Sequence, residues 1–304
     1  MDYDPETEIV VTIGATEALT AIMMTFFNQG DEIIVPTPSY ALYFPIIQLT
    51  KSKVVSINTS MTDFVLTPES LEQSLKEHPK AKVIILNYPT NPTGREYSAD
   101  NLQKIAEIIR KHHLYVISDE IYSELVYGMP HTSIARYIPE RTLVVNGLSK
   151  SHAMTGYRVG YVAGPAELVK WILEMHAFMV TAPSNPAQAA AVEALENGAD
   201  DPLESRKIYQ RRRDYLVKSL NEMGLETVES DGAFYMFVKI PAQYGQDDQA
   251  FAWDLASKGK VAGIPGNSFG EGGKRYIRFS YAASDETLKE AMKRVKEFMA
   301  KEIK

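Results

Sequence analysis

The stretch Asn146–Tyr161 holds three side chains that can do chemistry together, namely Ser149, Lys150 and Arg158. It begins at the end of the apolar, β-branched run Thr142–Asn146, so Lys150 stands where a buried strand is expected to end. A lysine in a dry environment near another cation has a lowered pKa, and its neutral amine attacks carbonyl groups. An arginine beside a serine hydroxyl binds a phosphate ester through two parallel hydrogen bonds. These residue types therefore suit an amine nucleophile next to a phosphate-binding site.

An amine that attacks an aldehyde beside a phosphate-binding site is what pyridoxal phosphate requires of a protein. The same stretch also fits an ordinary polar loop after a buried strand, because a short motif is only a hypothesis. The ends of the other predicted strands have to distinguish these two interpretations.

A second anion site is predicted at Gly14–Glu17, directly after the β-branched run Glu8–Ile13. A helical pattern begins there and ends near Gly30. The free N–H groups of Ala15 and its neighbours, the positive end of the helix dipole and the Thr16 hydroxyl would all face an anion. The alternative is a plain helix start with Thr16 as its N-cap.

Two more polar residues follow predicted strands. Tyr40 comes after Glu32–Pro36, and Asn91 comes after Lys82–Asn87. A tyrosine in this place can lie on a flat ring, although such tyrosines more often serve packing. Two prolines and a glycine make the loop Tyr88–Gly94 rigid, so it either aims the Asn91 amide at a ligand oxygen or simply forms a turn.

Asp119 and Tyr122 come directly after the predicted strand Tyr115–Ser118. A carboxylate at the tip of a buried strand costs free energy unless it is paired. Such a position favours a functional role over a structural one.

Strands that alternate with helices from residue 8 to residue 163 predict an α/β fold, with a mostly parallel sheet wrapped by helices. A further strand is expected at Lys53–Ile57, and helices at Thr67–His78 and Ser98–Lys111. In such folds ligands bind at the carboxyl ends of the strands. One edge of the sheet should therefore collect the residues that follow strands: Thr16, Tyr40, Asn91, Asp119, Tyr122, Ser149 and Lys150.

Beyond residue 163 the pattern changes to that of a smaller α+β domain. Helices are expected at Pro165–Met179, Asn185–Asn197, Pro202–Met223, Asp248–Lys258 and Asp285–Lys304. Short strands are expected near Glu226–Val228, Ala233–Lys239, Lys260–Ile264 and Arg275–Tyr281. We accordingly predict a large cofactor-binding domain at residues 1–205 and a small C-terminal domain at residues 206–304.

Two features of the small domain bear on function. Arg278 stands alone among apolar and aromatic neighbours, so its guanidinium needs a carboxylate partner from the protein or from a substrate. The glycine-rich stretch Gly266–Gly273 is expected to be a mobile loop.

Composition excludes several classes of function. The chain has 304 residues, 45% of them hydrophobic, and a net charge of −7, which argues against a nucleic-acid-binding or membrane-binding surface. The absence of cysteine excludes disulfides and thiolate metal sites and fits a reducing compartment. We see no signal-peptide pattern and no apolar run of the ~20 residues that a membrane span needs, which predicts a cytoplasmic protein. A dinucleotide-binding Rossmann enzyme is excluded because no G-x-G-x-x-G turn follows the first strand.

The chain resembles the fold-type I pyridoxal phosphate-dependent aminotransferases, in the branch that contains the aromatic and aspartate aminotransferases. The resemblance covers essentially the whole sequence through six motifs in the family's order: GATEA, PSY, NYPTNPTG, SDEIY, NGLSKSHAMTGYRVGY and RYIRFSYA.

The resemblance implies roles for residues that already suit the chemistry. Lys150 would attach covalently to the cofactor and later move a proton between the substrate's Cα and the cofactor's C4′. Asp119 would pair with the pyridine nitrogen and keep it protonated. Tyr122 and Asn91 would bond the phenolic oxygen of the cofactor.

The remaining implied roles concern binding. The phosphate would be held by Ala15, Thr16, Ser149 and Arg158. Tyr40 matches the aromatic residue that stacks on the cofactor ring. Arg278, with Asn91 beside it, matches the residue that binds the α-carboxylate of the substrate.

The chain departs from the family in one respect. Members carry a longer segment before the GATEA motif, whereas here Gly14 lies close to the first residue. That segment supplies a glycine-bearing loop over the substrate, a tyrosine that reaches the phosphate of the neighbouring subunit, and an arm that holds the homodimer. We therefore expect an N-terminally truncated form.

The function implied is a ping-pong transfer of an amino group from an L-amino acid to a 2-oxo acid. An aromatic donor is favoured by Tyr40, Tyr43 and Phe44, and by the lack of an obvious second arginine in Thr181–Ser184. The alternatives are an N-acetyl-diaminopimelate or aspartate aminotransferase, a C–S lyase with the same cofactor, and a non-catalytic truncated subunit.

Overall fold

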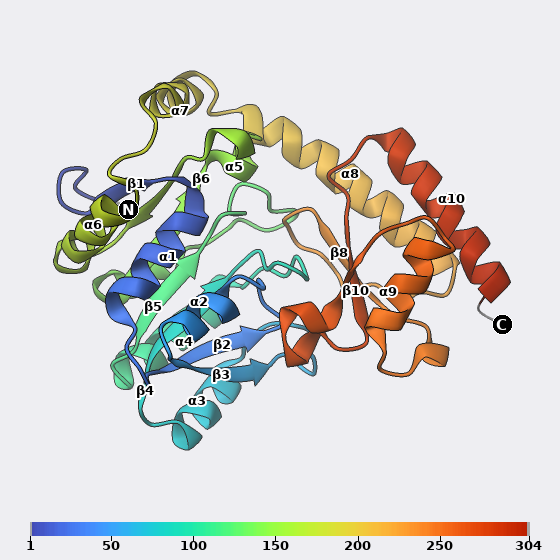
Figure 1. The fold of residues 1–304 in the computed structure, drawn as a ribbon, viewed down its shortest axis with the longest axis horizontal. Coiled ribbons are helices and arrows are strands. Elements are labelled where there is room, and N and C mark those ends of the chain that lie inside the picture. Colours follow the sequence, from blue (N-terminus) through green and yellow to red (C-terminus); the bar gives the residue numbers. More distant parts are fainter. Residues whose placement is uncertain (1, 303–304) are drawn as a thin grey trace.

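A seven-stranded sheet is the larger of the two sheets in the computed structural model, which describes residues 2–302 (Figure 1). The strands lie in the order β1-β7-β6-β5-β4-β2-β3. Their bounds are β1 Ile9–Thr12, β2 Glu32–Thr37, β3 Lys53–Asn58, β4 Ala81–Asn87, β5 Tyr115–Asp119, β6 Thr142–Gly147 and β7 Gly160–Ala163. The pairings among β2, β3, β4, β5 and β6 are parallel, and β7 is antiparallel to both of its neighbours. The predicted mostly parallel α/β sheet is confirmed.

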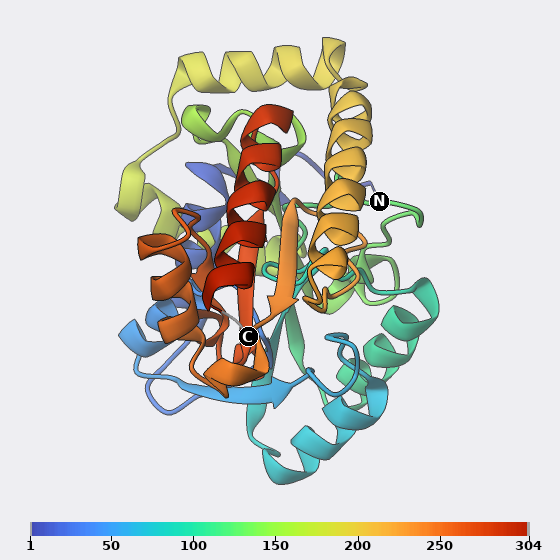
Figure 2. The ribbon, with the colours of Figure 1, turned by 90° about the vertical axis from the view of Figure 1, so that its right-hand side faces the viewer.

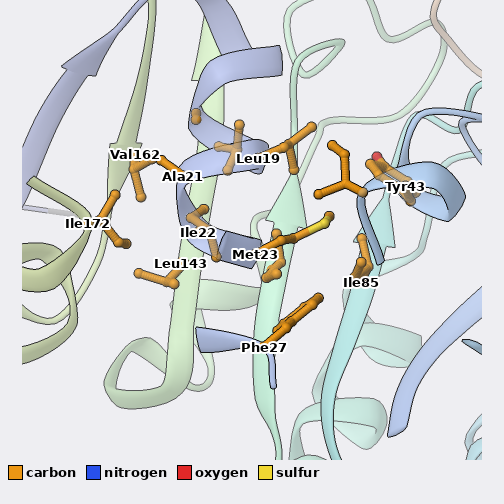
Figure 3. Close-up of a cluster of buried hydrophobic side chains, with 14 of the residues drawn as sticks. Leu19, Ala21, Ile22, Met23, Phe27, Tyr43, Ile85, Leu143, Val162 and Ile172 are labelled. Carbon is orange, nitrogen blue, oxygen red and sulfur yellow. The ribbon is translucent and has the colours of Figure 1, made fainter. Parts of the chain in front are cut away.

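Helices cover both faces of this sheet. One face carries α1 Gly14–Phe26, α2 Tyr43–Leu49 and α6 Ala166–Val180, and the other carries α3 Pro68–Glu77 and α4 Ala99–Lys111. The alternation of side chains along β4 explains the two cores, because Ile85 faces the α1 side whereas Ile84 and Leu86 face the α3 and α4 side. Figure 3 shows the first core, in which Ile22 and Met23 of α1 lie among side chains from the sheet and from α6.

Local capping explains where two helices of the second face begin. The Thr67 hydroxyl accepts a hydrogen bond from the Ser70 N–H at 3.2 Å at the start of α3. Ser98 does the same for the Asn101 N–H at the start of α4, also at 3.2 Å. These side chains satisfy N–H groups that a helix start leaves free, and both predicted helices begin at these two residues.

The C-terminal part contains a three-stranded antiparallel sheet in the order β8-β10-β9. Its strands are β8 Tyr235–Lys239, β9 Ile264–Pro265 and β10 Tyr276–Ser280. It packs with α8 Asp201–Glu222, α9 Asp248–Ser257 and α10 Asp285–Glu302 around a separate core. Figure 2 shows α8 and α10 running beside each other over this sheet. The predicted boundary between residues 205 and 206 falls within α8 and stays a prediction.

Several predicted elements differ from the structure. The helix from Gly14 ends at Phe26, and Thr16 lies inside its first turn, so the N-cap alternative for Thr16 is wrong. The strand expected near Glu226–Val228 is a single bridge between Thr227 and Val238, and that expected at Lys260–Ile264 is reduced to β9. The last two residues of the predicted C-terminal helix, 303 and 304, lie outside the described residues.

The stretch Gly266–Gly273 is packed, although a mobile loop was predicted. It forms two short 3-10 helices, and Phe269 is only 2% exposed. The Ser39 N–H donates to the Phe269 carbonyl at 2.9 Å. Gly272 lies so close to β2 that a Cβ there would stand 2.2 Å from the Thr37 carbonyl oxygen. The glycines therefore allow close backbone approach at this position.

Within the described part of the chain, no helix has both the length and the apolar character needed to cross a membrane.

Candidate active site

A cavity at the carboxyl ends of the strands collects the predicted site residues. All nine residues predicted to bind the cofactor line it: Ala15, Thr16, Tyr40, Asn91, Asp119, Tyr122, Ser149, Lys150 and Arg158. The lining also includes residues that were not predicted, namely Leu19, Asn87, Ile121, Thr155 and Tyr235. Tyr235 belongs to β8, so the small sheet contributes part of the wall.

Asp119 is the last residue of β5 and is 3% exposed. Its Oδ2 accepts a hydrogen bond from the Tyr43 hydroxyl at 2.6 Å, and its Oδ1 accepts a longer one from the Ile121 N–H at 3.3 Å. Burial raises the pKa of Asp119 to about 6, although both hydrogen bonds act to lower it. A cationic partner in the cavity would stabilise the charged carboxylate.

Lys150 lies in α5 Leu148–Ser151, directly after β6. Burial lowers the pKa of its amine, and the positive charges of Arg158 and Arg278 lower it further. Its Nζ lies 5.5 Å from the centre of the Phe234 ring, a contact that favours the ammonium form and so opposes these effects. The environment is the one expected for an amine nucleophile.

The start of α1 and Arg158 meet in the wall of the cavity. Arg158 adopts a left-handed backbone conformation with φ of 57°, and its Nη1 donates to the Thr155 carbonyl at 3.0 Å. Its guanidinium lies against Gly14, where a Cβ would stand 2.5 Å from Nη2. Gly160 approaches the same turn, since a Cβ there would lie 2.5 Å from the Ala15 nitrogen. The free N–H groups of the helix and the guanidinium therefore form one anion-binding corner.

Arg278 projects from β10, and its Nη1 donates to Asn91 Oδ1 at 2.7 Å. The guanidinium lies over the Tyr235 ring at 4.3 Å and the Phe269 ring at 4.9 Å. Its Nε is buried without a hydrogen-bond partner. The protein thus offers an amide oxygen and two rings but leaves donors of the guanidinium available for an anionic ligand.

Two tyrosines of the site have partners that the sequence did not reveal. The Tyr122 hydroxyl lies 2.7 Å from the Tyr235 hydroxyl, and both side chains are buried. Tyr40 is partly buried and packs edge-on against Tyr43, with 5.6 Å between the ring centres. Its predicted place on the face of the cofactor ring stays a prediction.

Sequence reasoning missed Tyr43 as a partner of Asp119, and it missed Asn87 and Tyr235 altogether. Tyr43 stands three residues after Tyr40, which would place the two rings near one another in a helical turn, but this spacing does not reveal the hydrogen bond to Asp119. Asn87 donates from its amide to the Asp119 carbonyl at 3.0 Å and ends a predicted strand, which was a usable signal.

The donor set of the cavity fits pyridoxal phosphate. A buried carboxylate of raised pKa, an amine of lowered pKa and an anion-binding helix start are the groups that such a cofactor requires at its ring nitrogen, aldehyde and phosphate. The fold and the cavity together define a pyridoxal phosphate-dependent enzyme of the fold-type I class.

The particular family follows from comparison with known proteins. The chain belongs to the aminotransferases of class I and II, whose family model matches residues 1–295. It is therefore an aminotransferase that uses pyridoxal phosphate. The predicted family, enzyme class and cofactor are confirmed.

Individual relatives differ in their substrates. The chain is 43% identical to the probable N-acetyl-LL-diaminopimelate aminotransferase of Bacillus subtilis, over 99% of this chain and 76% of that protein. It is 36% identical to aromatic-amino-acid aminotransferase 2 of Thermococcus litoralis, over 98% of this chain and 78% of that protein. The crystal structure of the aromatic aminotransferase from Pyrococcus horikoshii superposes with a TM-score of 0.94 at 37% identity, over 99% of this chain and 81% of that one.

The raised pKa of Asp119 predicts an effect on stability. A rise from 3.8 to about 6 means that the stabilising contribution is complete below pH 3.8 and is lost as the pH rises through 6. In the protein without cofactor, Asp119→Asn should therefore increase the free energy of unfolding at pH 7 by ~1–3 kcal/mol, and the gain should shrink toward pH 4. Urea denaturation at the two pH values measures this.

The matched control for this measurement is Asp100→Asn, because the Asp100 side chain is 84% exposed and the change should have little effect. A loss of stability in Asp119→Asn at pH 7 would contradict the prediction. With cofactor bound, the same variant should keep the cofactor but lose most of its turnover.

Proposed function

We propose that this aminotransferase transfers the amino group of an aromatic L-amino acid to a 2-oxo acid by a ping-pong mechanism. The observation that carries the proposal is the Arg278–Asn91 pair, which lies against Tyr235 and leaves the buried Arg278 Nε free. It supplies a place for an α-carboxylate beside an aromatic ring. Its contact residues Asn91 and Tyr235 line the cavity that Lys150 also lines, whereas Arg278 itself is not among the lining residues.

In this proposal the cavity holds the cofactor through three groups of residues. Asp119 faces the ring nitrogen, and Tyr43 fixes that carboxylate through the 2.6 Å hydrogen bond. Tyr122 and Asn91 bond the phenolic oxygen, and Tyr40 covers one face of the ring. The phosphate lies at the anion-binding corner, with Ala15, Thr16, Ser149 and Arg158.

When bound, the cofactor supplies an electron sink that stabilises negative charge at the substrate's Cα. Arg278 orients the substrate by binding its carboxylate, so that the Cα–H bond faces Lys150. The Lys150 amine, with its lowered pKa, removes the proton from Cα and holds it at Nζ.

The aromatic preference rests on Tyr235 and Phe269, whose rings lie against Arg278, and on Tyr40, which lines the cavity with Tyr235. A second candidate is an acylated diaminopimelate, because the 43% identical relative is named for that substrate. The two substrates share an α-amino acid head, which Arg278 would bind in the same way.

Titration of the cofactor-loaded protein separates these substrates. L-Tyrosine should convert the visible absorption band to that of the amine form of the cofactor at a concentration roughly tenfold or more below that needed for L-aspartate, because an aromatic side chain buries more apolar surface. A lower half-saturating concentration for N-acetyl-LL-diaminopimelate would give precedence to the second candidate. Release of pyruvate and ammonia from a sulfur-containing amino acid would indicate lyase chemistry.

Lys150→Ala tests the central role in the mechanism. The variant should lose the covalent attachment of the cofactor and turn over roughly 1,000-fold or more slowly, because both nucleophile and proton carrier are removed. Reduction with borohydride followed by mass measurement reports the attachment. Lys104→Ala on the exposed face of α4, away from the cavity and from α6, is the control and should behave as the parent protein. Unchanged transamination by Lys150→Ala would disprove the assignment.

A homodimer is also part of the proposal. α6 and the adjoining α7 Asn185–Asn197 expose large apolar side chains, namely Trp171, Leu173, Phe178, Val192 and Leu195. α7 lies at the margin of the molecule and contacts the apolar residues of the body mainly through Ala187 and Ala191 (Figure 1). An apolar surface of this kind is typical of a subunit interface.

The mass in solution tests the homodimer. Sedimentation equilibrium should give twice 34.0 kDa for the parent chain, and Phe178→Asp should weaken the association because Phe178 is 89% exposed on α6. Met61→Asp is the control, since Met61 is 91% exposed in the turn after β3. A monomeric parent chain at micromolar concentration would refute the dimer.

A further inference from the structure

Tyr235 brings a hydroxyl of the small sheet into the cavity of the large one. It is the first residue of β8, it is 7% exposed, and it lines the cavity that holds Lys150 and Asp119. Its hydroxyl oxygen lies 2.7 Å from that of Tyr122, and the two rings stand nearly perpendicular at 79°. A contact this short between two buried hydroxyls is a hydrogen bond.

The chemistry of two paired hydroxyls constrains their protons. Each carries one proton, and only one of the two can lie between the oxygens. The pKa values of Tyr122 and Tyr235 are both raised by burial, so both groups keep their protons at neutral pH. If Tyr122 donates to an anionic acceptor in the cavity, its oxygen becomes the acceptor and Tyr235 must be the donor.

Arg278 fixes Tyr235 in this arrangement. In the register of the small sheet Tyr235 pairs with Ser280, which places Arg278 on the neighbouring strand two residues away and on the same face. The guanidinium lies 4.3 Å from the centre of the Tyr235 ring. A cation over the face of a phenol withdraws charge from it and makes its hydroxyl a stronger donor.

We propose that Tyr235 is a positioning residue that donates its hydroxyl proton to Tyr122 and thereby turns the Tyr122 proton toward the phenolic oxygen of the cofactor. The inference rests on the proposed contact between Tyr122 and that oxygen. A donor that itself accepts a hydrogen bond is polarised and binds an anion more strongly. Tyr235 therefore stabilises the negative charge on the phenolic oxygen without touching it.

The test is the pH titration of the visible band of the bound cofactor, which reports the charge on the phenolic oxygen directly. Tyr235→Phe keeps the ring and its contact with Arg278 and removes only the hydroxyl. We expect the pH midpoint of this titration to rise by about 0.3 to 1 pH unit in Tyr235→Phe. The variant loses the hydrogen bond that Tyr235 donates to Tyr122, so Tyr122 stabilises the negative charge on the phenolic oxygen less strongly. Tyr281→Phe is the control, since its buried hydroxyl contacts Ser230 and the Ala233 carbonyl and does not line the cavity, and its midpoint should not move.

A double-mutant cycle separates positioning from a general structural effect. Tyr122→Phe should raise the midpoint further than Tyr235→Phe, and adding Tyr235→Phe to Tyr122→Phe should change nothing more. An unmoved midpoint in Tyr235→Phe, or shifts that add in the double variant, overturns the inference while the role of Tyr122 stands. An unmoved midpoint in Tyr122→Phe overturns the proposed contact with the phenolic oxygen itself. Thermal denaturation without cofactor verifies that each variant is folded.

Discussion

The reversal of direction at β7 is the constraint on which the site depends. Because β7 is antiparallel to both β6 and β1, the latter two strands run the same way and end at the same edge of the sheet. The helix start after β1 and the lysine after β6 are thereby neighbours. Gly160 marks the closest point, where a side chain would collide with the Ala15 nitrogen and the Asn146 carbonyl oxygen. If β7 were parallel to β6 and still antiparallel to β1, then β1 would run opposite to β6. The anion-binding turn after β1 would then lie at the other edge of the sheet from Lys150.

The site brings together ionisable side chains whose charged forms are destabilised by burial when no ligand is bound. Burial raises the pKa of Asp119 and lowers the pKa values of Lys150 and Arg278. In all three side chains it therefore favours the neutral form. The surrounding hydroxyl and amide partners compensate only in part, as the unpartnered Arg278 Nε shows. Free energy of this kind is released when ligands of complementary charge bind, so the same burial serves affinity for cofactor and substrate.

The sequence predicted those site residues whose position follows from the residues next to them in the chain. Strand runs followed closely by Asp119, Asn91 or Lys150 are visible as patterns, and the rule that parallel strands share a carboxyl edge was enough to predict that these residues meet. Contacts between segments that are distant in the sequence could not be predicted from it. The Tyr43 hydroxyl reaches Asp119 across 76 positions, and Tyr235 meets Tyr122 from another sheet, so no periodicity encodes either pair. Gly266–Gly273 was misjudged because glycines that permit dense packing look the same in a sequence as glycines that permit mobility.

The packing of that glycine-rich segment on β2 has a mechanical consequence. Phe269 lies under the Arg278 guanidinium, and its carbonyl is bound by the N–H of Ser39, the residue before Tyr40. This hydrogen bond therefore joins the segment next to Arg278, which would bind the substrate carboxylate, to the segment next to Tyr40, which would cover the cofactor ring. A rotation of the small sheet away from β2 would have to break the hydrogen bond between Ser39 and Phe269.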